Sequence, residues 1–103
     1  MSYEQRCQED ARLAILAELA QQRDATLNSR SITRVIEALG MKRSDEWTEN
    51  QLRRLEEFGA IQLRNADLPG LGRVLIATLT RTGRDHVERR ALLAGVSVPV
   101  DVE

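Results

Sequence analysis

The sequence has 103 residues, of which 15 are basic and 16 are acidic, for a formal net charge of -1. This length fits one compact domain with a modest core and excludes a second domain. The single Cys excludes an internal disulfide, the single His excludes most zinc sites, and a charge near zero argues against indiscriminate nucleic-acid binding.

Neither end of the chain nor its apolar stretches point to a membrane. The N-terminus has no basic run followed by an apolar core of signal-peptide length. The longest strongly apolar stretch, residues 13–20, contains Glu18 and is too short to span a bilayer. We expect a cytoplasmic protein with no membrane partner.

Residues 4–22 contain no Gly or Pro and are rich in helix formers, so they predict a first helix. Its second half is apolar nearly all round, which predicts cover both from the chain's own core and from a second subunit. A short polar connection follows, in which Leu27 is expected to add one edge β-bridge. A second helix then begins at Ser29 or Ser31 and ends at Gly40.

A third helix is predicted from its N-cap, Ser44, to Gly59. Two helices joined by a short link with a Gly at the joint are typical of a helix-turn-helix. Residues 60–64 and 73–80 are strand-like, and the turn residues between them predict an antiparallel hairpin.

A last helix is expected to begin at Thr80 or Thr82, to run to about Ala94 and to end at Gly95. Beyond it, residues 96–103 alternate Val with polar residues or Pro. This period of two is consistent with an edge strand, and a frayed tail is an equal alternative.

The order helix, helix, helix, hairpin, helix predicts an α+β fold. It is the winged helix-turn-helix, with a three-helix core, a two-stranded wing hairpin and a C-terminal helix. We expect residues 1–95 to form this domain and residues 96–103 to form an extended C-terminal arm or tail.

Two motifs resemble bacterial winged-helix transcriptional regulators. LRRLEEFGAI, residues 52–61, is similar to the end of their recognition helix, and ATLTRTGRDHVE, residues 77–88, to the exit from their last strand. Over nearly the whole chain, the sequence resembles small winged-helix proteins of Mu-like phages and prophages. The matching segments are Met1–Ala20, Ser44–Gly59, Ala77–Asp85 and Gly95–Pro99.

The phage resemblance implies the winged-helix fold and a phage or prophage origin. The group has no established activity, so it supports the fold more than a function. Such relatives carry a basic C-terminal tail, whereas this chain ends in Asp101 and Glu103. This difference argues against DNA contact by the tail.

The sequence indicates no set of catalytic side chains. Cys7 belongs to the first predicted helix and His86 to the last, and no third group is set beside them. No Gly-rich loop lies between a strand and a helix. We expect no enzyme activity, no cofactor and no metal site, with Cys7 as a half-buried small hydrophobe and His86 as a partly exposed helix residue.

In a winged helix the third helix enters the major groove. With Trp47, Leu52 and Leu55 facing inward, the predicted base-reading side chains are Thr48, Asn50, Gln51 and Arg53. The predicted phosphate contacts are Arg30, Arg34, Lys42, Arg43, Arg54, Arg64 and Arg73. Carboxylates in the first turns of the same helix argue modestly against sequence-specific binding. An equal alternative is that the predicted phosphate contacts are solvated arginines without a binding role.

Two function hypotheses follow. The first is a non-catalytic, regulator-like module that binds double-stranded DNA. The alternative is a protein-interaction adaptor in a phage or regulatory assembly, whose acidic third helix meets a basic phage or host partner. A homodimer is expected in either case. Its predicted interface residues are Leu13, Leu16, Leu92, Leu93 and Val98.

Overall fold

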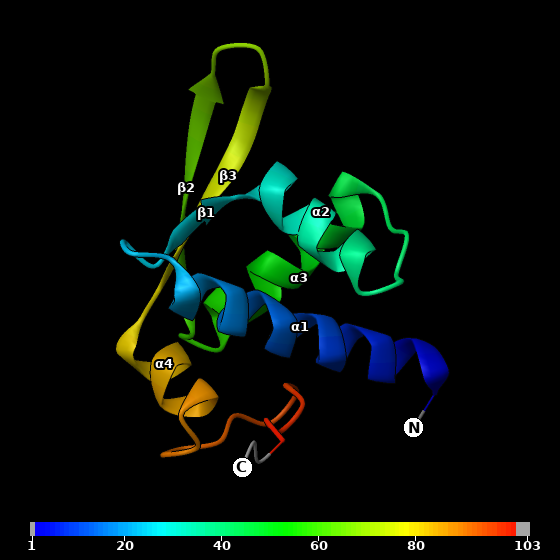
Figure 1. Ribbon diagram of the computed structural model, residues 1–103, viewed down its shortest axis with the longest axis vertical. Helices are drawn as coiled ribbons and strands as arrows, with labels where there is room; N and C mark the ends of the chain where they lie inside the picture. Colours follow the sequence, from blue (N-terminus) through cyan, green and yellow to red (C-terminus); the bar gives the residue numbers. More distant parts are fainter. Residues whose placement is uncertain (1, 101–103) are drawn as a thin grey trace.

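The computed structural model describes residues 2–100. Four helices and three strands follow one another as α1 Tyr3–Gln21, β1 Thr26–Asn28, α2 Ser29–Ala38, α3 Asp45–Glu57, β2 Ile61–Leu68, β3 Gly72–Leu79 and α4 Arg81–Val87. Figure 1 shows α1, α2 and α3 packed together, α4 beside the lower end of the sheet, and the β2–β3 hairpin projecting from the body. The predicted α+β class and the order of the elements are confirmed.

The sheet is antiparallel, with β3 between β1 and β2. Leu27 pairs with Ala77, so the predicted bridge exists and belongs to a three-residue strand. A side chain of α2 also bonds to β3: the buried Ser29 Oγ accepts a hydrogen bond from the Leu75 amide at 3.1 Å. The start of α2 is therefore fixed to the middle of β3.

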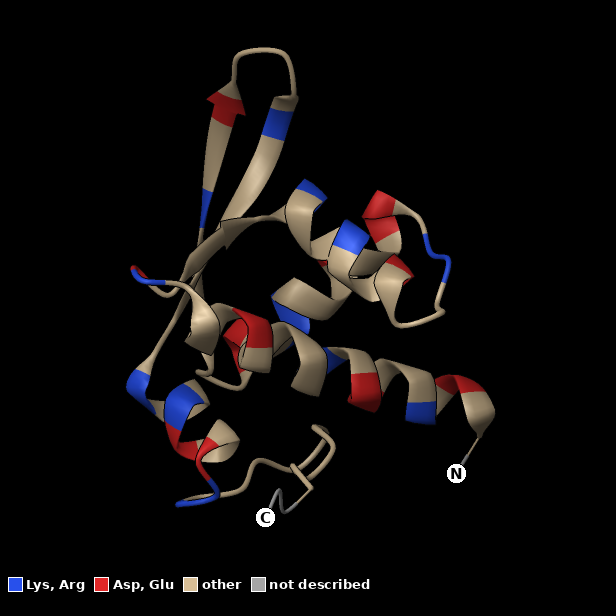
Figure 2. Cartoon of the chain, in the orientation of Figure 1, with Lys and Arg blue, Asp and Glu red and all other residues tan. Residues whose placement is uncertain are grey.

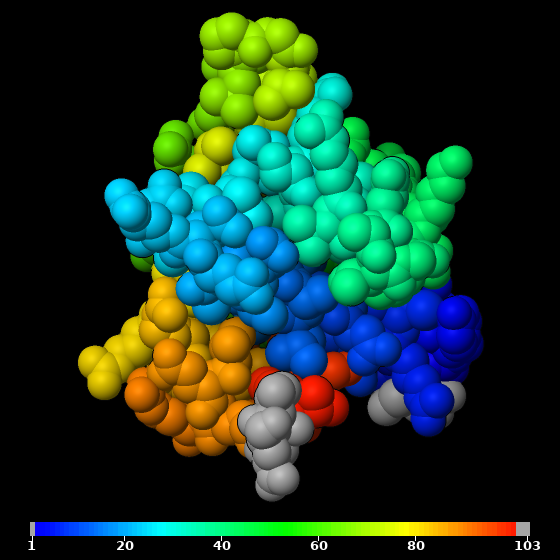
Figure 3. Space-filling view, viewed as in Figure 1, coloured from blue at the N-terminus to red at the C-terminus, as the bar shows by residue number. Residues whose placement is uncertain are grey.

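The hairpin β2–β3, called the wing below, is longer than the sequence pattern indicated. β2 continues to Leu68, and the tip is only the turn around Pro69 and Gly70. Figure 3 shows its green and yellow atoms standing above the rest of the molecule. β2 is an edge strand of the sheet, and the Leu63 amide on this edge donates to the Glu56 carboxylate at 3.1 Å.

The core lies between α1, α2, α3 and the near face of the sheet, and α1 contributes its largest share. Ala11, Ile15, Leu16 and Leu19 form one fully buried stripe of this helix. The prediction of Leu16 as a subunit-interface residue is therefore wrong, since its side chain faces the core of its own chain. Within residues 2–100 no helix is both long and apolar enough to cross a bilayer.

Local signals set most helix ends. Ser44 Oγ accepts from the Trp47 amide at 3.1 Å, and Thr80 Oγ1 accepts from the Gly83 amide at 3.2 Å, so both predicted N-caps are confirmed. Gly40 and Gly59 have positive φ directly after α2 and α3. The N-cap of α2 is Asn28, whose side chain accepts from the Ser31 amide at 2.9 Å.

α4 ends at Val87, so the predictions of a helix to Ala94 and of Gly95 as its end are wrong. Arg89 has a φ of 62°, outside the helical region, and the chain turns back there. Beyond this turn, Leu93 and Val96 pack against the core. Packing of these two side chains outweighs the local helix propensity of the segment.

Residues 96–100 form no strand, so the edge-strand prediction fails for this part, and 101–103 lie outside the described residues. Nor is the segment frayed at its start. Val96 is 5% exposed, and the Ser97 amide donates to the Glu9 carbonyl at 3.2 Å. Val96 is thus part of the core, and Ser97 is held on α1.

Candidate nucleic-acid interface

α3 presents one side to solvent. Its inward side is formed by Thr48, Gln51, Leu52 and Leu55. The opposite side is an exposed ridge, spaced i, i+4, i+7 and i+11, of Glu46, Asn50, Arg53 and Glu57. Two of the four predicted base readers, Asn50 and Arg53, lie on this ridge.

The prediction of Thr48 as a base reader is wrong, because the side chain is fully buried. Its hydroxyl accepts a hydrogen bond from Thr33 Oγ1 at 2.9 Å, and Thr33 Oγ1 also lies 3.1 Å from the Ser29 carbonyl. These contacts join α2 to α3. The sequence pattern put Trp47 in this inward position, whereas Trp47 lies half-buried at the flank of the helix.

Gln51 is also not a base reader, since it is only 4% exposed. Its Oε1 accepts from Arg12 Nε at 2.9 Å, and Arg12 Nη1 donates to the Gly95 carbonyl at 2.8 Å. Burial lowers the pKa of Arg12. Arg12 therefore connects α1 to α3 and to the C-terminal segment. The sequence pattern did not indicate this role.

The exposed side of α3 faces the wing across a groove of about 290 Å³. The groove is lined by Glu49, Arg53, Asn65, Arg73, Val74 and Leu75. Asn65 pairs with Leu75, and Arg73 lies two positions before Leu75 on the same strand. All three therefore share the face on which Leu75 reaches the core. This register aims Arg73 at the same groove as Arg53 of α3.

Other predicted phosphate contacts lie on α2, on the α2–α3 link and on the opposite face of the wing. Arg30 and Arg34 are exposed on α2, and Lys42 is exposed on the α2–α3 link. Arg64 pairs with Ile76, on the opposite face of the wing from Arg73. Figure 2 shows basic positions on α2, on the link and on the wing, and acidic ones at the start of α3.

Arg54 and Arg43 are engaged within the chain. Arg54 Nη1 lies 3.1 Å from Glu57 Oε1, and its guanidinium lies over the Phe58 ring at 5.3 Å. Arg43 lies 5.2 Å from the Trp47 ring centroid and donates to Glu4.

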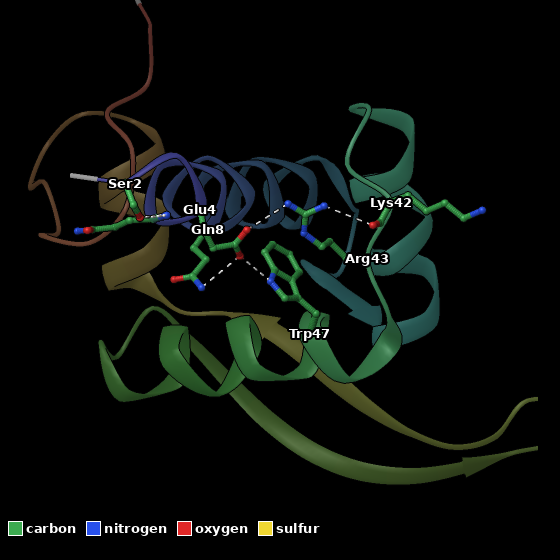
Figure 4. Close-up of polar contacts among 7 residues, drawn as sticks. Ser2, Glu4, Gln8, Lys42, Arg43 and Trp47 are labelled. Carbon is green, nitrogen blue, oxygen red and sulfur yellow. Dashed lines mark hydrogen bonds and ion pairs between the residues drawn. The ribbon is translucent and has the colours of Figure 1, made fainter.

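Glu4 is the centre of a cluster that fixes the start of α3 to α1 (Figure 4). Its Oε2 accepts from Trp47 Nε1 at 3.0 Å, and its Oε1 accepts from Arg43 Nη2 at 3.3 Å. The Trp47 hydrogen bond, followed by the charge of Arg43, lowers the pKa of the Glu4 carboxyl. The cluster thereby orients both α3 and the link that precedes it.

The Glu4 cluster predicts a pH-dependent effect of Glu4→Gln. Because the folded pKa is lowered, the stabilisation by the Glu4 charge is present above the unfolded pKa and is lost as the pH falls through the folded one. We expect Glu4→Gln to lower the melting temperature at pH 7, with a deficit that shrinks as the pH falls through the folded pKa. Glu37→Gln is the control, because no hydrogen bond or ion pair of its side chain occurs within residues 2–100. A Glu4→Gln deficit of the same size at pH 7 and in acid would contradict the assignment.

No protein-family model and no curated protein matches the sequence. Among solved structures, the chain is similar to Bacillus subtilis PadR, whose crystal structure was determined in complex with operator DNA. The TM-score is 0.60 and the identity 23%, with 89% of this chain and 51% of the PadR chain covered. This chain thus spans about half the length of PadR. The likeness shows that the winged-helix fold expected from the sequence is shared with PadR.

Proposed function

We propose that the chain is a non-catalytic winged-helix module that binds double-stranded DNA through α3 and the wing. The observation that carries the proposal is the groove in which Arg53 of α3 and Arg73 of β3 meet. Their guanidinium groups come from two elements that a winged helix places on DNA together. The fold similarity to PadR, a protein solved with operator DNA, supports DNA as the partner.

The described charges fit a duplex better than the net charge suggests. Arg53 and Arg73 are exposed, as are Arg30 and Arg34 on α2, the helix that crosses the backbone in a helix-turn-helix. Acidic side chains lie on α1 and beyond β3, but α3 itself also carries Asp45, Glu46, Glu49, Glu56 and Glu57. Binding is therefore local to one side of the molecule and depends on few phosphate contacts.

Salt titration of duplex binding tests the proposal. About four phosphate contacts per chain give a slope of log K against log salt of roughly -3.6. Fluorescence anisotropy of a labelled mixed-sequence duplex, between about 50 and 200 mM salt, measures this slope. Binding that is undetectable at the lowest salt, or that does not change with salt, would overturn the proposal.

The adaptor hypothesis has one observation in its favour, the acidic first turn of α3 formed by Asp45 and Glu46. A basic protein partner would suit that turn, whereas phosphates would not. Absence of DNA binding together with purification of one specific protein on the immobilised chain would favour the adaptor.

We further propose that the chain forms a homodimer through the outer side of α1. Leu13, Ala14 and Ala17 form, with Asp10, Leu39 and Met41, a mostly apolar groove of about 440 Å³. Leu39 is 53% exposed and lines this apolar groove. Figure 3 shows α1 and the end of α2 side by side on this surface.

The remaining predicted interface residues divide into two groups. Leu92 and Val98 are about half exposed and stay candidates, whereas Leu93 packs partly against the core.

Static light scattering should give twice the mass of one chain, and Leu39→Glu should reduce the measured mass to that of one chain. A mass of one chain for the original protein would contradict the dimer proposal.

The phage or prophage origin and the cytoplasmic location stay predictions from sequence.

A further inference from the structure

We infer that Glu49 and Arg53 act as a pair that selects one G·C base pair, with Glu49 as the specificity-determining residue. The inference rests on the proposed DNA-binding function and concerns the same groove. It also assigns a role to the Glu49 carboxylate, whose negative charge would otherwise only weaken binding to phosphates.

The two side chains are presented together. Glu49 precedes Arg53 by four residues, and Glu49 Oε1 lies 3.9 Å from Arg53 Nη2. Their side chains are 34% and 60% exposed, and both line the groove between α3 and the wing. They therefore offer one composite polar surface, with a guanidinium fork beside a carboxylate.

This composite surface is complementary to the major-groove edge of one base pair. A G·C pair presents two acceptors, guanine N7 and O6, followed by one donor, cytosine N4. Arg53 supplies donors for the two acceptors, and Glu49 supplies an acceptor for the N4 donor. An A·T pair presents a different order and a methyl group, so it cannot satisfy both side chains at once.

Discrimination then comes mainly from the carboxylate. At a base pair without a donor in the right position, Glu49 lies near the phosphates without a hydrogen bond from the base edge, which weakens binding. Glutamine at this position carries no charge and can both donate and accept. It should therefore tolerate several base pairs.

Other acids of α3 do not share this arrangement. Glu57 has a closer partner than Glu49, since its Oε1 lies 3.1 Å from Arg54 Nη1, but it does not line the groove. Glu57→Gln therefore removes the same charge from the same helix and serves as the matched control.

The experiment selects bound duplexes from a randomised library with the original protein, Glu49→Gln, Glu57→Gln and Arg53→Ala, followed by sequencing and by affinity measurements on single duplexes. For the original protein we expect one position at which replacing G·C weakens binding about tenfold or more. Glu49→Gln should reduce this ratio to about two while it strengthens binding to the other sequences. Glu57→Gln should leave the ratio unchanged.

The outcomes separate the two proposals. If the original protein binds no duplex, the proposed function itself is wrong. If it binds without any preferred G·C position, or if Glu49→Gln keeps the preference, DNA binding stands and the pairing inference is overturned. Equal melting temperatures of the original protein and both Gln variants exclude a folding defect as the cause of a changed ratio.

Discussion

His86→Ala is expected to lower the free energy of unfolding by about 3 kcal/mol or more, the largest stability effect among the predictions. The imidazole is fully buried, although the sequence indicated a partly exposed residue. Its Nδ1 accepts from the Leu93 amide at 2.9 Å, and its Nε2 lies 2.9 Å from the Ser97 carbonyl. Alanine would leave a cavity and two backbone groups without their partners.

These two partners also define the tautomer of the ring. An amide can only donate and a carbonyl can only accept, so the proton is on Nε2 and Nδ1 carries the lone pair. Through these bonds, His86 holds both the turn after α4 and the segment that docks on α1. Its loss should therefore release residues 93–97 as a unit.

Thermal denaturation and hydrogen exchange measure the effect. A loss of about 3 kcal/mol corresponds to a decrease of roughly 12–24 °C in the melting temperature of a domain of this size. The Leu93 amide should lose its protection from exchange. Arg81→Ala, an exposed change on the same helix, should leave both readouts unchanged. An unchanged Leu93 amide in His86→Ala would contradict the role assigned to the ring.

The second large effect is expected on DNA binding. Combined replacement of Arg53 and Arg73 by alanine should weaken duplex binding about tenfold or more and make the salt slope shallower by about one to two. Both guanidinium groups line the groove between α3 and the wing, and each is exposed. Their loss removes the basic side chains of that groove while it leaves the core intact.

Arg64→Ala provides the control on the same hairpin. It removes an equal charge from the opposite face of the wing, where Arg64 lies with Gln62, Ile76 and Thr78. We expect less than a twofold change in affinity. An equal loss in Arg64→Ala and in the Arg73→Ala single variant would show that overall charge, rather than this groove, determines binding.

The elements of the fold were predictable because their ends depend on neighbouring residues. Ser44 and Thr80 cap helices through amides three residues ahead, and Gly40 and Gly59 stop helices through their own φ. Such signals survive in the sequence because no distant contact competes with them.

The candidate site was less predictable because it depends on how α3 is rotated against the rest of the chain. The pattern favoured Trp47 as an inward residue, but Glu4 holds the indole at the flank of the helix. Thr48 and Gln51 then face Thr33 and Arg12, side chains 15 and 39 residues away in the sequence. A polar residue that is buried by a distant polar partner looks like a surface residue in a periodicity argument.

The hydrogen bond from the Leu63 amide to Glu56 has a further consequence. β2 is eight residues long and lies at the margin of the sheet, where its unpaired amides and carbonyls could nucleate addition of a foreign strand. The Glu56 carboxylate occupies one of these amides and also brings a negative charge to the margin. Addition of a foreign strand is consequently disfavoured at this end of β2.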